Sequence, residues 1–130
     1  METRFRLVGI TPARFEEYSS WFTARNRPLP AWSSDGVFVT DPDGVLLAGC
    51  LVFPTDGPYA VAEFAATNPS VPVRLSHDAM VFGAQLLTVY GAMRSKVVLI
   101  CPVSTGMVKM LKRAGFVTGA APYMSPAVPS

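Results

Sequence analysis

The sequence has few of the residues on which disulfide frameworks, metal sites and membrane segments depend. Its 130 residues include two cysteines and one histidine, with neither a CxxC nor an HxxxH spacing, so we predict no metal site and no disulfide framework. No apolar run approaches the roughly 20 residues of a membrane-spanning helix. The N-terminal residues METRFRLVGI lack the long apolar stretch and the cleavage site of a signal peptide. We therefore expect a cytoplasmic protein in which Cys50 and Cys101 are reduced and buried.

Charge is also scarce, and the two signs are balanced. Charged residues make up 15% of the chain, against about 25% in an average soluble domain. Eleven Lys and Arg oppose nine Asp and Glu, without a run of either sign. This pattern does not predict the concentrated basic face that strong nucleic-acid binding needs. Apolar residues form 50% of the chain, enough for a real core. We expect one domain over residues 1–130, with a frayed tail over 124–130.

The first half of the chain predicts a strand, a helix and three further strands. A short apolar strand over 5–10 is followed by Thr11 as an N-cap and Pro12 at the first helical position. Phe15, Tyr18 and Phe22 recur at helical spacing and would form the buried stripe of this helix. Strands are then predicted over 37–40, 45–53 and 59–66. The turn sequences DPDG and PTDG between them indicate an antiparallel meander.

The second half alternates helix and strand. Ser76 would cap a long, mostly apolar helix from about His77 to Met93, and a β-branched strand follows over 96–101. Ser104 or Thr105 would cap a last helix that ends at Gly115, with a further strand left open within 116–123. The predicted order is β-α-β-β-β-α-β-α-(β). It favours an α/β (α+β layered) domain, in which helices cover both faces of a mixed, mostly antiparallel sheet.

Two short sequence strings, together with the predicted order of helices and strands, support a family resemblance. The first opens the long helix and reads Arg74, Leu75, Ser76, His77, Asp78, Ala79; the second, RAGF, ends at Phe116. With the order of elements, they resemble the GNAT acyltransferases, whose corresponding loop reads [QR]-x-x-G-x-[GA]. The resemblance is strongest over 45–116 and implies a GNAT-like fold. This sequence departs from the pattern at two positions: His77 replaces the central glycine, and Leu111 replaces a tyrosine that often serves as general acid.

The resemblance also implies a site for acyl-coenzyme A. Backbone N–H groups of residues 76–79, together with Arg74, would hold the pyrophosphate, since helix N-termini bind anions. The thioester and pantetheine would lie along Phe64, Ala65 and Ala66. Glu63 would accept the amine proton, and strand alternation puts it on one face with Tyr59 and Val61, while Ala60, Ala62 and Phe64 share the other. Ser104 and Tyr123 are candidate catalytic groups near the leaving thiol. Trp21, Phe22 and Trp32 would form the wall of the acceptor site.

Each of these residues also has a plainer structural explanation. Ser104 can serve simply as a helix cap, and Glu63 can be a surface carboxylate. The aromatic residues can belong to the core. We therefore keep three hypotheses. The first is an N-acyltransferase that moves an acetyl or similar group from acetyl-CoA to a small-molecule amine or a protein acceptor. The amine would attack the thioester directly. The resemblance also implies a possible homodimer. The others are a catalytically silent binding or structural module of the same fold, and an unrelated α+β domain.

Overall fold

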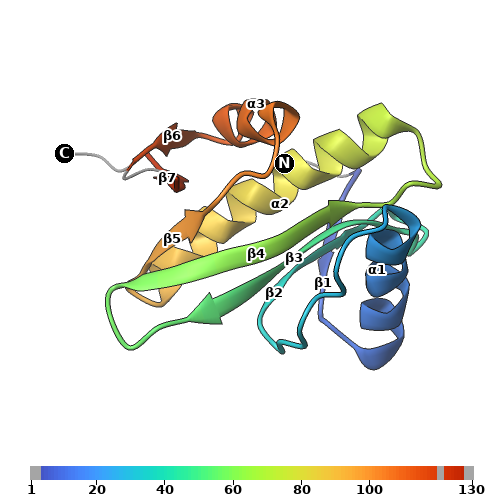
Figure 1. Ribbon diagram of the computed structural model, residues 1–130, viewed down its shortest axis with the longest axis horizontal. Helices are drawn as coiled ribbons and strands as arrows, with labels where there is room; N and C mark the ends of the chain where they lie inside the picture. The colour runs from blue at the N-terminus through green and yellow to red at the C-terminus, as the bar shows by residue number, and fades with distance from the viewer. Residues whose placement is uncertain (1–3, 120–121, 128–130) are drawn as a thin grey trace.

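A computed structural model describes residues 4–119 and 122–127, which form a seven-stranded sheet with helices on both faces (Figure 1). The strand order is β1-β2-β3-β4-β5-β7-β6, and β4 and β5 form the parallel pair. The elements follow the predicted order with one strand more: β1 Arg6–Val8, α1 Pro12–Ala24, β2 Gly36–Thr40, β3 Leu46–Pro54, β4 Tyr59–Thr67, α2 Val73–Met93, β5 Val97–Ile100, α3 Thr105–Arg113, β6 Phe116–Thr118 and β7 Met124–Pro126.

Two hydrophobic clusters lie on opposite faces of the sheet. The larger cluster joins α2 and α3 to alternate residues of the strands, among them Val37, Val39 and Val52. The smaller cluster joins α1 to the intervening residues, such as Phe38 and Leu51. Figure 1 shows the same layering, with α2 and α1 on different sides of the strands. This alternation is the period-2 pattern expected of strands that are covered on both faces.

The predicted caps of α1 and α3 are confirmed. The Thr11 hydroxyl accepts a hydrogen bond from the Arg14 backbone N–H, with Pro12 in the first turn. Ser104 accepts one from the backbone N–H of Met107 in the same way. These side chains satisfy donors that the first helical turn leaves without intrahelical partners. Gly115 follows α3 with a φ of 96°, the left-handed conformation that commonly ends a helix.

The predicted start of α2 is wrong. The helix begins at Val73, directly after Pro72, and Ser76 lies within its first turns. The backbone N–H of Ser76 donates to Pro72 O, and its hydroxyl donates to Val73 O. A serine hydroxyl inside a helix can bond to a carbonyl of the preceding turn, and the proline preceding Val73 does not prevent helix formation after it. The helix therefore begins about one turn earlier than predicted.

The C-terminal prediction also needs correction. Residues 116–123 were expected to hold one strand, and 124–130 a frayed tail. Instead β6 and β7 form an antiparallel hairpin, and Met124 of β7 also pairs with Ile100 of β5. The backbone N–H of Ala127 donates to Gly115 O. The buried side chain of Met124 explains why this part of the tail is ordered, whereas residues 128–130 lie outside the described part.

One irregularity interrupts the sheet in the middle of β4. Leu51 of β3 pairs with Glu63, and Gly49 pairs with Ala66, so one residue of β3 faces two residues of β4. Phe64 has a φ of 57°. This is a β-bulge, which shifts the alternation of the strand. Glu63, paired with buried Leu51, and Phe64 therefore both face the α1 side, which corrects the predicted grouping of Phe64 with Ala60 and Ala62.

Candidate functional site

A cavity of about 260 Å³ lies where β4 and β5 separate. The pairing of these strands ends at Ala62 with Ile100, and β4 continues to Thr67 beside α2 and the start of α3. In Figure 1 the two strands diverge, with α3 next to the gap. The residues around the cavity are Arg25, Arg27, Ala65, Ala66, Thr67, His77, Met80, Val103, Ser104, Met107 and Met110.

The inner wall of the cavity is apolar and adaptable. Met80 and Met107 are buried, and Met110 is partly buried against the same core. Methionine side chains are flexible and polarisable, and they fit irregular apolar ligands well. The opposite wall is the part of the β4 edge that lies beyond its last pair with β5, from Ala65 to Thr67. Such an edge offers backbone N–H and C=O groups to a ligand that contains amides.

Two arginines stand at the mouth of the cavity, at the C-terminal end of α1. Asn26 lies between them with a φ of 55°. The backbone N–H of Arg27 donates to Phe22 O, and that of Asn26 donates to Thr23 O. This is the Schellman arrangement, in which a left-handed residue turns the chain out of the helix. The turn brings both arginine side chains to the cavity.

Both arginines are held by contacts other than ion pairs, as far as the described residues show. The Arg25 guanidinium donates to Thr67 Oγ1 at 3.2 Å, at the end of β4, and the Arg27 guanidinium lies over the Phe22 ring. Burial first, and then the nearby Arg27 charge, lowers the pKa of Arg25. In the described part of the chain, the ion pairs found are those of Asp78 with Arg4 and Arg113. An electropositive mouth above an apolar interior suits an elongated ligand with an anionic end.

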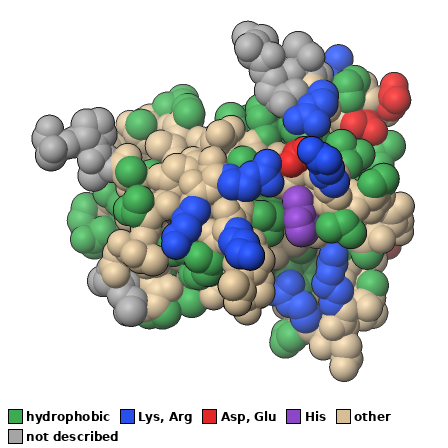
Figure 2. Space-filling model, turned by 90° about the horizontal axis from the view of Figure 1, so that it is seen from above, with side chains coloured by type: hydrophobic (Ala, Val, Ile, Leu, Met, Phe, Trp, Pro, Cys, Tyr) green, Lys and Arg blue, Asp and Glu red, His purple; other side chains and the backbone are tan. Residues whose placement is uncertain are grey.

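Figure 2 shows this face of the molecule. The single histidine side chain lies among several Lys and Arg side chains, with one acidic side chain between those above it. The basic residues on the elements around the cavity are Arg25 and Arg27 after α1, Arg74 in α2, and Lys109, Lys112 and Arg113 in α3. They are spread over three elements, so no run of charge marks them in the sequence. The sequence pattern neither predicted nor excluded this grouping, because it forms only when the three elements come together.

The structure brings only some of the predicted α2 residues to the cavity. His77 lines it, and Arg74 is exposed in the first turn. Leu75 packs against the core, and Ser76 and Ala79 are buried. Asp78 lies 3.1 Å from the Arg113 guanidinium and 3.5 Å from that of Arg4. The hydrogen bond from Arg113 is the main cause that lowers the pKa of Asp78.

The predicted phosphate cradle of residues 76–79 is wrong in its backbone groups. Because α2 begins at Val73, the N–H groups of residues 77–79 lie inside the helix, where each bonds to the carbonyl four residues earlier. The N–H groups without intrahelical partners are those of Val73, Arg74 and Leu75. An anion at this helix start would therefore lie about one turn earlier than the sequence string predicted.

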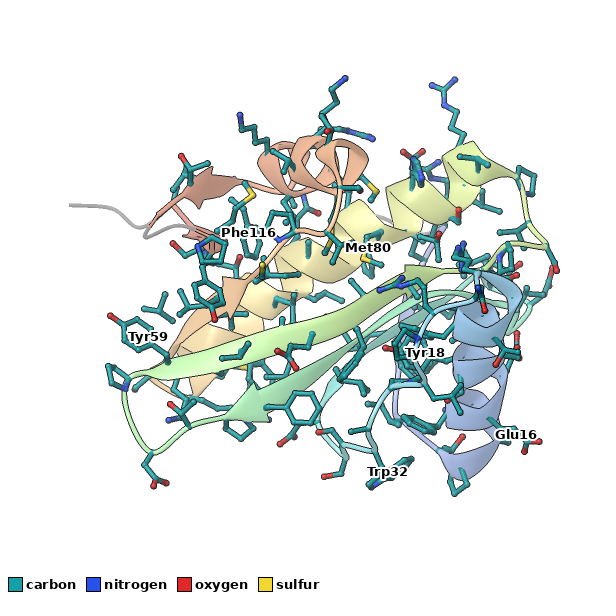
Figure 3. All side chains as sticks on the ribbon, in the orientation of Figure 1. Glu16, Tyr18, Trp32, Tyr59, Met80 and Phe116 are labelled. Atoms are coloured by element: carbon teal, nitrogen blue, oxygen red, sulfur yellow. The ribbon has the colours of Figure 1, made fainter. Side chains whose placement is uncertain are left out.

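Glu63 and Tyr123 lie outside the cavity. Glu63 is exposed on the α1 face of the sheet, directly before the bulge. Tyr123 is 37% exposed and borders a separate hollow of about 480 Å³ with Tyr59, Val97 and Leu99. Figure 3 shows Tyr59 at the end of β4 that is far from α1. Ser104, in contrast, borders the cavity itself.

The predicted aromatic wall divides into core and surface. Trp21 and Phe22 are 3% and 1% exposed and pack between α1 and the sheet, so they cannot contact an acceptor. Trp32 is 53% exposed, and its ring lies 4.9 Å from that of Phe15, centre to centre. In Figure 3 it lies in the loop beside α1. The buried stripe of Tyr18 and Phe22 is confirmed, while Phe15 is only partly buried.

Sequence reasoning missed the residues that most distinguish this site. Arg25 and Arg27 follow α1 in the string RNR, and asparagine is a residue that tolerates the left-handed end of a helix. That signal could have located the helix end, but not the cavity that lies beside it. Within the part of the chain that the structure describes, no group of three or more His, Cys, Asp or Glu could hold a metal ion. No helix there is long and apolar enough to cross a membrane.

Comparison with known proteins identifies the fold. No protein-family model and no curated protein matches the sequence. Among solved structures, Ard1 from Thermoplasma volcanium superposes with a TM-score of 0.64 and 11% identity over 94% of both chains. A protein of Klebsiella pneumoniae assigned as an acyl-CoA N-acyltransferase gives a TM-score of 0.63 at 12% identity, over 96% of this chain and 98% of that one.

A third solved structure adds a ligand to the comparison. The GNAT family N-acetyltransferase YhbS from Escherichia coli, in complex with CoA, gives a TM-score of 0.57 at 12% identity, over 97% of this chain and 82% of that one. The chain therefore has the mixed α/β fold of the GNAT acyltransferases, as the order of elements predicted. An unrelated α+β fold is excluded.

Proposed function

We propose that this protein is an N-acyltransferase that moves an acetyl or similar acyl group from acyl-CoA to an amine. The observation that carries the proposal is the cavity between β4 and β5, with an apolar methionine wall, a strand edge and an arginine pair at its mouth. Acyl-CoA has the matching parts: a thioester, an arm with two amides, and phosphates. The shared fold supports the proposal, because the three similar structures include N-acyltransferases, one of them solved with CoA.

The donor would lie with its acyl end at the bulge and its phosphates at the surface. The thioester would lie at Ala65, and the edge of β4 from Ala66 onward would bond the amides of the pantetheine arm. Arg25, Arg27 and His77 would contact the phosphates, since guanidinium groups form charge-assisted hydrogen bonds to phosphate oxygens. Arg74 and the free N–H groups at the start of α2 are further proposed contacts. The Asp78 carboxylate is paired with arginines, so it repels the phosphates little.

Acyl transfer would take place where the gap opens toward the α1 face of the sheet. The amine nitrogen attacks the thioester carbonyl carbon, a C–N bond forms, and the C–S bond breaks. Glu63, exposed on that face beside the bulge, would accept the amine proton, directly or through water. Ser104 uses its oxygen to cap α3, and its hydroxyl would donate a hydrogen bond to the departing thiolate. Tyr123, whose side chain borders the other hollow, is the proposed proton donor to that thiolate, and exposed Trp32 is a proposed acceptor contact.

A silent binding module of the same fold is the second candidate. His77 in place of glycine and the longer α2 favour it, because both change the helix end at which such folds are expected to bind phosphate. This candidate predicts an intact fold without turnover.

Two finer parts of the proposed function have direct tests of their own. The acceptor is a small amine or a protein, and an acceptor assay distinguishes them. The protein is proposed to be a homodimer, which a sedimentation measurement tests.

Turnover separates the two candidates. We would incubate the protein with acetyl-CoA and a panel of amines and N-terminal peptides, and follow CoA release by chromatography. We expect release with at least one acceptor, and a kcat lowered about 100-fold by Glu63→Gln, the usual loss when a general base is removed. Glu16→Gln, which changes an exposed carboxylate of α1, should leave kcat unchanged. No release with any acceptor would favour the binding module, and equal effects of the two variants would remove Glu63 from the mechanism.

A further inference from the structure

We infer that Tyr18 is a positioning residue for the proposed acyl transfer: its buried hydroxyl holds the Phe64 carbonyl, so that the Ala65 N–H points into the cavity toward the thioester oxygen. The inference rests on the proposed function and adds a residue of α1 that contacts neither the donor nor the acceptor.

The bulge is a strained conformation that needs support. Phe64 is not glycine, yet its φ is 57°, in the left-handed region where a side chain is unfavourable. Such conformations persist only where the surrounding structure fixes them. The Phe64 ring packs against Phe22 and Phe53, each with its centre 6.2 Å away. These contacts hold the side chain, but they do not orient the peptide group that follows it.

Tyr18 supplies that orientation. Its hydroxyl donates a hydrogen bond to Phe64 O, and its ring is completely buried between α1 and the sheet. Figure 3 shows Tyr18 directed from α1 toward the strands. The ring has little freedom to move, because it packs against Phe38 with centres 4.9 Å apart. A Cβ added at Gly49 would lie 3.0 Å from the Tyr18 ring, which shows how closely the strand approaches it.

The hydroxyl remains a donor over the working pH range. Burial is the main cause that raises the pKa of Tyr18 far above its ordinary value. The group therefore stays protonated, and it can donate to a carbonyl at any pH at which the protein is folded.

Planarity of the peptide transmits this contact to the other face of the sheet. In a trans peptide the C=O of one residue and the N–H of the next point in opposite directions. Because Phe64 O points toward α1, the Ala65 N–H points toward the α2 side, where Ala65 borders the cavity. A fixed backbone N–H near a reacting carbonyl stabilises the negative charge that develops on its oxygen. Tyr18 itself is buried and does not line the cavity, so loss of its hydroxyl would free this peptide to rotate while leaving the groups that bind CoA in place.

A structural explanation competes with this one, because buried tyrosine hydroxyls generally need a hydrogen-bond partner. The two explanations differ in what Tyr18→Phe changes. If the bond serves stability alone, the folded variant keeps its kcat. If it orients the Ala65 N–H, kcat falls while the binding of CoA, which has no acyl carbonyl, is preserved.

The test compares Tyr18→Phe with Thr55→Val. Thr55 donates a hydroxyl bond to Tyr59 O, a backbone carbonyl at the far, exposed end of the same strand. For both variants we would measure kcat and KM for acetyl-CoA, Kd for CoA, and the thermal midpoint. We expect Tyr18→Phe to lower kcat by about 10- to 100-fold and to leave the Kd of CoA within about twofold, and we expect Thr55→Val to leave both unchanged. A wild-type kcat in folded Tyr18→Phe would overturn the inference while leaving the proposed function intact.

An NMR measurement on the wild-type protein covers the case in which Tyr18→Phe does not fold. The amide signal of Ala65 is compared on adding CoA and on adding a CoA thioether that carries a ketone in place of the thioester. A downfield shift of the Ala65 proton with the ketone only is expected, and equal spectra would overturn the inference. If the wild-type protein releases no CoA with any acceptor, the proposed function fails and the inference fails with it.

Discussion

Single residues in this protein take their roles from neighbours that are distant in sequence. Asp78 follows His77 in the helix that borders the cavity, and from the sequence it opposes an anion there. In the structure its carboxylate is paired with Arg113, 35 positions later, and with Arg4 near the N-terminus. The local string could not predict this pairing, because it depends on the packing of α3 against α2. The charge facing the cavity is therefore positive.

The two cysteines give a prediction at this scale. Both were expected to be buried, yet Cys50 is buried and Cys101 is exposed after β5. Burial, and then the charge of Glu63, raises the pKa of the Cys50 thiol to about 12. Because the thiolate is the reactive form, we expect an aromatic disulfide reagent at pH 8 to titrate one thiol in the folded protein and two in denaturant. Cys101→Ser should reduce the folded count to zero.

The opposite result has a clear meaning. Rapid modification of Cys50 in the folded Cys101→Ser protein would show that β3 and β4 open readily around the bulge. This result would contradict the view that the β-bulge of β4 is held in one rigid conformation.

At the scale of elements, local signals located most helices and strands but not every boundary. Thr11, Ser104 and Gly115 mark their helix ends through short-range hydrogen bonds or backbone conformation, so the sequence predicted them correctly. The start of α2 has no side-chain cap, and Ser76 offered a misleading one. The β7 strand was missed because three residues are too short for a periodic pattern. Its pairing depends on tertiary contacts with β5 and β6.

The end of α1 provides a prediction about an element. Asn26 holds the left-handed position that turns Arg25 and Arg27 toward the cavity. A β-branched residue is strained there by roughly 1–2 kcal/mol, whereas glycine is not. We expect Asn26→Val to lower the free energy of unfolding by about that amount in a urea titration and to weaken acetyl-CoA binding. Asn26→Gly should change the free energy of unfolding little, and equal losses in both variants would contradict the role of the turn.

At the scale of the whole molecule, the order of elements predicted the fold, and long-range contacts built the site. A meander, a helix and a parallel strand were enough to predict the mixed sheet, and solved structures confirm it. The cavity depends on where β4 leaves β5, on a bulge, and on a bond between Tyr18 and a carbonyl 46 positions away. No periodicity in the sequence encodes such contacts. Ser104 was predicted because it caps a helix locally, and His77 because it lies in the string that carries the family resemblance. No local signal pointed to Arg25 and Arg27.

The most direct test of the account is calorimetric titration with acetyl-CoA. The wild-type protein should bind with micromolar affinity, and Arg25→Glu and Arg27→Glu should each weaken binding about tenfold or more, as expected for the loss of a charge-assisted bond. Arg6→Glu, the same charge change on the distant strand β1, should leave the affinity within about twofold. Absence of binding at millimolar acetyl-CoA, or equal weakening by Arg6→Glu, would contradict the assignment of the cavity as an acyl-CoA site.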